Sequence, residues 1–190
     1  MATEPVPQHY DATQRAFHWL MAAVILLAIA IGVCTKYLPE HDPSRVALLA
    51  LHKSLGMTAL ALVVFRVVYR LFAGAPPYSE AMSPLVRLAA HGAHWALYAL
   101  MVALPLSGYV NSAAGGHDIP WFGLFTWPNV MPQDKALGHL ASQAHFWLAW
   151  AIGAALALHL AAVAWHLWVK RDDVFQRMWP ARTALAGGRK

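Results

Sequence analysis

Two histidines in the last apolar stretch of the chain, His145 and His159, have a spacing that suits chemistry at metal centres. On an α-helix, fourteen residues turn through about 1400°, so the two side chains point within roughly 40° of one direction. The same fourteen residues rise about 21 Å along the axis, which is well over half of a hydrocarbon core roughly 30 Å thick. One helix with an imidazole near each side of a membrane can hold two haems in series. Transmembrane electron transfer is therefore the first hypothesis.

The other histidines can be sorted by their depth in the predicted spans. The chain has 11 histidines, and ionisable side chains inside a membrane are costly and usually functional. Depth places His52 with His145 on one side, and His18 with either His159 or His166 on the other. Two cross-helix pairs result, one per leaflet, as bis-imidazole ligation of two b-type haems requires. Because His145 and His166 would separate the two irons by roughly 30 Å, the spacing favours His159, although depth alone leaves both open.

The composition excludes several classes of protein. Of the 190 residues, 59% are hydrophobic and 12% are charged, whereas soluble domains are about one quarter charged. We expect one integral membrane domain over residues 1–190, whose first apolar run is a retained span and not a secretory signal. The one cysteine, Cys34, excludes an intrachain disulfide, an iron–sulfur cluster and covalent haem attachment. The net charge of +5 suits membrane topology better than nucleic acid, because the basic residues flank apolar runs.

Four apolar runs are long enough to cross a bilayer as helices, which predicts an all-α bundle. They cover residues 16–35, 46–71, 88–111 and 142–169. Ten basic residues lie on one side of the predicted membrane: Arg15, Arg66, Arg70, Arg87, Lys170, Arg171, Arg177, Arg182, Arg189 and Lys190. Four lie on the other side: Lys36, Arg45, Lys53 and Lys135. The positive-inside rule therefore places both termini in the cytoplasm. Lys53 and Arg66 lie near the ends of the second run, where long side chains can reach the interface.

Three further features each have two interpretations. The aromatic stretch 121–127, in the long connection from residue 112 to residue 141, is either an interfacial aromatic belt or a substrate lid. Gly56 follows His52 by one turn, where a missing side chain either lets a porphyrin approach or allows helices to pack. His91 or His94 could deliver protons to a quinone, or the two could make structural contacts, either interhelical hydrogen bonds or contacts to a haem propionate.

Short motifs over roughly residues 9 to 180 resemble those of bacterial cytochrome b561 proteins. They are Tyr10-Asp11, Arg15-Ala16-Phe17-His18-Trp19-Leu20, His52-Lys53-Ser54-Leu55-Gly56, His94, Leu104-Pro105-Leu106-Ser107-Gly108-Tyr109, His145, His159 and Trp179-Pro180. The resemblance implies a multi-pass four-helix bundle in the bacterial inner membrane with two haems b. It assigns the inner haem to His18 and His159, in preference to His166, and the outer haem to His52 and His145.

The resemblance also implies oxidation of superoxide at the periplasmic face, with electrons passed to ubiquinone in the membrane. Arg15 is a candidate to neutralise the propionates of the inner haem, and Lys53 those of the outer haem. The alternative is a quinol-linked haem relay that serves a separate redox partner. A metal transporter is disfavoured because every Asp and Glu lies outside the four apolar runs. Against the superoxide hypothesis, the four external basic residues are balanced by Glu40, Asp42, Asp118 and Asp134.

Overall fold

The chain folds as an all-α bundle of four long helices in a computed structural model that describes residues 9–77 and 82–179. The helices are α1 (Ala12–Cys34), α2 (Pro43–Ala73), α3 (Pro84–Ala114) and α4 (Lys135–Ala164). All four are long and apolar enough to span a membrane, which confirms the predicted all-α fold class with four membrane-spanning helices. Pro180, Arg182, Arg189 and Lys190, on which part of the sequence argument rests, lie outside the described residues.

Each helix begins at a polar residue whose side chain accepts a hydrogen bond from a backbone N–H of the first turn. These residues are Asp11, Asp42, Ser83 and Asp134. Such caps satisfy donors that have no partner within the helix. Spans drawn from the apolar runs alone start inside these caps, so the predicted starts are several residues late. At their other ends, α1 runs into the 3₁₀ turn η1 (Thr35–Tyr37) and α4 into the π-helical η2 (Trp165–Lys170).

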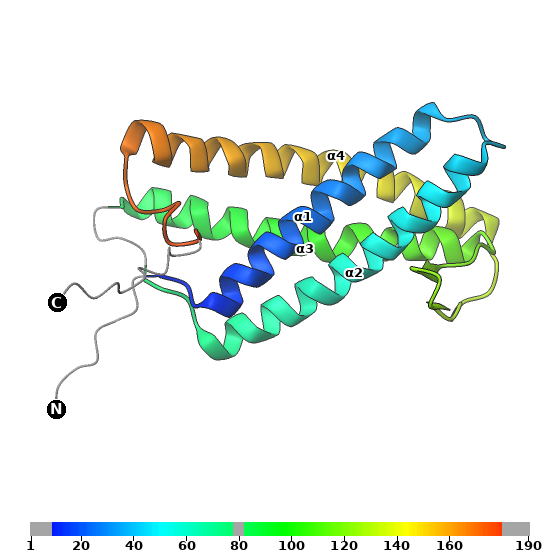
Figure 1. Ribbon diagram of the computed structural model, residues 1–190, viewed down its shortest axis with the longest axis horizontal. Coiled ribbons are helices and arrows are strands. Elements are labelled where there is room, and N and C mark those ends of the chain that lie inside the picture. Colours follow the sequence, from blue (N-terminus) through cyan, green and yellow to red (C-terminus); the bar gives the residue numbers. More distant parts are fainter. Residues whose placement is uncertain (1–8, 78–81, 180–190) are drawn as a thin grey trace, which may run out of the picture.

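The helices form two hairpins that cross obliquely (Figure 1). One hairpin joins α1 to α2, the other joins α3 to α4, and α2 packs against α3 between them. A buried core cluster (Met21, Ile25, Ala59, Val63 and Tyr98) fastens α1, α2 and α3 together. The start of α1 and the end of η2 lie at one end of the bundle, which we call the terminal end. The opposite end, which holds the α1–α2 turn and the α3–α4 connection, is the loop end.

The α3–α4 connection is a folded unit that the sequence did not predict. Its two short strands, β1 (Pro120–Trp121) and β2 (Phe125–Thr126), pair antiparallel. Gly123 in the turn has φ of +73°, a conformation that glycine adopts without strain. The Ser54 hydroxyl on α2 lies 3.0 Å from the oxygen of Pro120 and accepts the N–H of Phe122 at 2.9 Å. The connection is shorter than the predicted 112–141, because α3 continues to Ala114 and α4 already begins at Lys135.

Ser54→Ala is expected to loosen the strand hairpin without unfolding the bundle. Ser54 is 2% exposed, and its loss leaves the Phe122 N–H without this acceptor, at a cost of about 1–3 kcal/mol. Hydrogen–deuterium exchange over residues 118–128 should be faster in the variant. Ser142→Ala, which removes an exposed hydroxyl on α4, is the control. Unchanged exchange in Ser54→Ala would show that the hairpin is held by other contacts.

Candidate functional site

Two pairs of imidazole rings link α4 to the α1–α2 hairpin. The outer pair is His52 on α2 and His145 on α4, with ring centres 6.1 Å apart. The inner pair is His18 on α1 and His159 on α4, with ring centres 6.4 Å apart. Two imidazoles that bind one metal ion from opposite sides, each through a nitrogen about 2 Å away, have ring centres roughly 6 Å apart. Both pairs therefore have the separation that one haem iron requires.

The helix packing leaves width beside both pairs. α1 packs along α2, and α3 packs along α4. Within residues 9–77 and 82–179, neither α1 nor α2 makes more than marginal backbone contact with α4. A porphyrin extends sideways from the line that joins its two axial ligands, so it needs a seam of this kind. The donor set and its surroundings thus fit two haems.

In the outer pair, both histidines hold the tautomer that binds a metal through Nε2. The Nδ1 atom of His52 lies 2.9 Å from the backbone oxygen of Ala28, and that of His145 lies 3.0 Å from the oxygen of Leu104. A carbonyl oxygen only accepts, so each Nδ1 carries the proton and each Nε2 keeps its lone pair. Metal-binding histidines are typically oriented in this way. The Ser107 hydroxyl, also 3.0 Å from Nδ1 of His145, donates to Leu104 at 2.6 Å.

The inner pair has a cation against one of its rings. A guanidinium nitrogen of Arg66 lies 3.1 Å from Nδ1 of His18. Because guanidinium only donates, Nδ1 accepts, and the neutral ring then carries its proton on Nε2. Binding of iron through Nε2 of His18 therefore requires Arg66 to exchange Nδ1 for another acceptor.

Arg66 and a neighbouring hydroxyl mark where such an acceptor belongs. Arg66 is half-buried, and neither ion pair found among the described residues includes it. Its guanidinium lies 5.8 Å from the ring centre of Tyr98, whose buried hydroxyl has no hydrogen-bond partner among residues 9–77 and 82–179. Buried polar groups are normally satisfied, so this place suits a carboxylate such as a haem propionate.

A third imidazole also approaches the inner pair. The ring centre of His94 lies 6.0 Å from that of His159, and its Nδ1 lies 2.7 Å from the oxygen of Ala90. However, His94 is on α3, which packs directly along α4 and leaves little room for a porphyrin between them. His91, its predicted companion, is exposed and accepts the indole N–H of Trp95 at 2.9 Å.

The remaining predicted residues lie as follows. A Cβ built on Gly56 meets no described atom within 4 Å, so the side of α2 next to His52 is open, which favours the porphyrin interpretation of Gly56. Lys53 donates to the backbone oxygen of Asp118 at 2.7 Å, beside the outer pair. Arg15 is bound to the segment after η2, 3.4 Å from the oxygen of Trp179. His166, the rival of His159, is paired with Asp172 through a 2.6 Å contact.

Sequence reasoning missed the roles of Arg66, Tyr98 and Ser107. Arg66 stands out in the sequence as a charge inside an apolar run at the depth of His18, although its position near the end of the run predicts only an interface anchor. Ser107 lies in the quoted motif of the third span without an assigned role, and Tyr98 follows His94 by one helical turn, hence on the same face.

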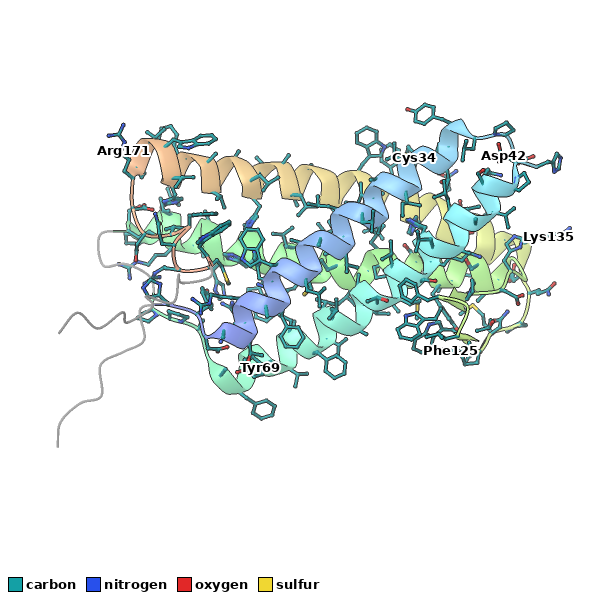
Figure 2. The ribbon with its side chains drawn as sticks, viewed as in Figure 1. Cys34, Asp42, Tyr69, Phe125, Lys135 and Arg171 are labelled. Carbon is teal, nitrogen blue, oxygen red and sulfur yellow. The ribbon has the colours of Figure 1, made fainter. Side chains whose placement is uncertain are left out.

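Labelled side chains mark the two ends of the bundle. Figure 2 shows Asp42, Lys135 and Phe125 at the loop end, and Tyr69 and Arg171 at the terminal end. In the part of the chain that the structure describes, no group of three or more His, Cys, Asp or Glu side chains is suited to hold a metal ion.

Comparison with known proteins gives a consistent result over almost the whole chain. A family model described as prokaryotic cytochrome b561 matches residues 9–181. The chain is 34% identical to "Cytochrome b561 homolog 2" of Escherichia coli (strain K12), over 94% of this chain and 95% of that protein. It is 27% identical to "Probable superoxide oxidase CybB" of Yersinia pestis, over 91% and 97% of the two chains. It is 23% identical to "Cytochrome b561 homolog 1" of Escherichia coli (strain K12), over 91% and 98%.

Proposed function

The chain belongs to the prokaryotic cytochrome b561 family, and from this premise we propose that it carries electrons across the membrane through two haems b. In this proposal His52 and His145 hold the outer haem, and His18 and His159 hold the inner one. The observation that carries it is the pair of ring separations, 6.1 and 6.4 Å, at two depths of one helix. Haem iron, when bound, accepts and releases one electron at a time.

The chain's own residues orient the ligands and balance charge. The carbonyls of Ala28 and Leu104 hold the Nδ1 protons of the outer pair, and Nε2 of each ring is left for the metal. We assign the inner propionates to Arg66, together with the earlier candidate Arg15. We assign the propionates of the outer haem to Lys53. With His52 and His145 both engaged at the outer haem and His18 and His159 both engaged at the inner one, bound haems would supply electron exchange without direct coordination of the substrate.

The proposed donor is superoxide at the loop end, and the proposed acceptor is ubiquinone. Two superoxide ions lose one electron each to give two dioxygen molecules, and one ubiquinone takes both electrons with two protons. The name of the Yersinia pestis relative supports this substrate. Two of the four carboxylates at this end, Asp42 and Asp134, are engaged in capping helices, while Lys53 is held beside the outer pair.

The test is optical. The oxidised protein in detergent is exposed to a steady flux of superoxide, with and without a soluble ubiquinone. We expect rapid haem reduction, followed by reoxidation when quinone is added. Haems that ignore superoxide but are reduced by quinol would instead support the second candidate, a relay for a separate redox partner. No haem absorption at all would overturn both.

Arg66→Gln is expected to weaken binding of the inner haem. Charge-assisted hydrogen bonds contribute about 1.5–3 kcal/mol, which corresponds to roughly tenfold to a hundredfold faster haem release. Haem release can be followed by transfer to apomyoglobin, with the outer haem as internal reference. Arg87→Gln removes an exposed cation of the terminal end that bonds to Met82 and serves as the control. An unchanged release rate would exclude Arg66 as a propionate partner.

A further inference from the structure

Each histidine of the outer pair rests against a glycine of a neighbouring helix. A Cβ built on Gly32 of α1 would lie 2.9 Å from Cε1 and 3.1 Å from Nδ1 of His52. A Cβ built on Gly108 of α3 would lie 3.0 Å from Cε1 and 3.2 Å from Nδ1 of His145. Real Cβ atoms essentially never approach closer than 3.0 Å. A side chain at Gly32 would therefore clash with the ring of His52, and one at Gly108 would force the ring of His145 to shift.

The two sites share a second element. His52 donates to the oxygen of Ala28, four residues before Gly32, and His145 donates to the oxygen of Leu104, four residues before Gly108. Residues four apart lie on the same face of a helix. Each glycine thus leaves the helix backbone uncovered beside the carbonyl that accepts the Nδ1 proton. We call the pair Gly32 and the Ala28 carbonyl, and the pair Gly108 and the Leu104 carbonyl, a notch each.

The outer rings, which rest in the notches, are also turned differently from the inner rings. Their planes are inclined by 83°, close to perpendicular, whereas the planes of His18 and His159 are inclined by 57°. No described glycine lies against His18, His94 or His159. The outer rings are thus constrained on one edge by backbone and at Nδ1 by a carbonyl, and the inner rings lack this constraint.

We propose that Gly32 and Gly108 are positioning residues that lock the axial imidazoles of the outer haem nearly perpendicular and so give that haem an electronic signature distinct from the inner one. This inference rests on the proposed haem function. Second-shell contacts determine ring orientation, and perpendicular axial imidazoles give low-spin ferric haem its most anisotropic EPR signal. The outer haem accordingly supplies the more anisotropic of two ferric signals.

The test compares Gly32→Ala and Gly108→Ala with the wild type, all as purified haem-loaded protein. The control is Gly92→Ala on α3, since Gly92 is exposed and its added Cβ meets nothing within 4 Å. We expect either notch variant to shift or lose the more anisotropic signal, with the other signal unchanged and the control like the wild type. Ser107→Ala, which keeps the notch and removes the nearby hydroxyl, is expected to retain the signal.

Two EPR results would each overturn the inference. One is a wild-type spectrum in both notch variants, and the other is loss of the signal in Ser107→Ala but not in Gly108→Ala. The variant His145→Gly distinguishes a local effect on the ring of His145 from a general folding defect. In this variant, added imidazole should replace the missing ring and restore binding of the outer haem. If Gly108→Ala acts through the ring of His145, added imidazole should restore the outer haem equally well in the double variant Gly108→Ala/His145→Gly. The reason is that a free imidazole, unlike a tethered ring, can shift away from the added methyl group. Failure of that rescue also overturns the inference. A wild type without two haems would refute the proposed function itself.

Discussion

Replacing His52 with alanine is expected to leave one haem in each chain and an empty apolar slot beside α2. A haem held by one remaining axial imidazole loses half its protein ligands and its fixed orientation, so haem content should fall to about half. The inner pair, His18 and His159, does not include His52 and should therefore keep its haem. The measurement is the haem-to-protein ratio from the pyridine haemochrome, together with the EPR spectrum, which should lose its more anisotropic signal.

The matched control is His139→Ala, which removes an exposed histidine from α4 ahead of His145. It should bind as much haem as the wild type. Full haem content in His52→Ala would refute the outer pair, and loss of both haems would show that the two centres do not form independently.

The second large effect concerns the choice between His18 and His94 as the partner of His159. His18→Ala is expected to remove the inner haem, and His94→Ala is expected to keep both haems. The reason is the packing: α1 stands apart from α4 across the seam, whereas α3 lies against α4. The tautomers alone favour His94, because Nδ1 of His94 lies against the carbonyl of Ala90, whereas Nδ1 of His18 faces Arg66. Haem binding at His18 therefore requires Arg66 to move to another acceptor.

Haem-to-protein ratios of the two variants, measured side by side, decide the question. The reverse outcome, with His94→Ala at about half the haem and His18→Ala at full content, would assign the inner haem to α3 and α4. His91→Ala is the control, since this neighbouring histidine is exposed and bonded to Trp95.

Most of the fold follows from the sequence because a bilayer restricts what can span it. Backbone groups in lipid must be satisfied internally, so long apolar runs become helices. The depth of each histidine then depends only on its position along a run, which is why the sequence already groups His52 with His145. The helix starts were missed because hydropathy ignores capping residues such as Asp134, which lies well before the last apolar run.

The remainder depends on contacts that no local pattern encodes. The strand hairpin is held to α2 by Ser54 and Thr58, far away in sequence. Gly32 and Gly108 belong to helices other than those of the rings they receive, so their role appears only once the helices are packed. The same is true of the contact between Arg66 and His18.

In the proposed function, α4 contributes one ring to each haem site, so a single helix sets the axial distance between the two sites. That distance is about 21 Å along the axis, set by helix pitch, and it is insensitive to how the two hairpins shift against each other. A shift of the α1–α2 hairpin would strain both centres at once while leaving their spacing intact. Under the proposed function, the rate of electron tunnelling, which falls steeply with distance, therefore depends on the pitch of α4. The ligand geometry at each haem site depends instead on how the two hairpins pack against each other.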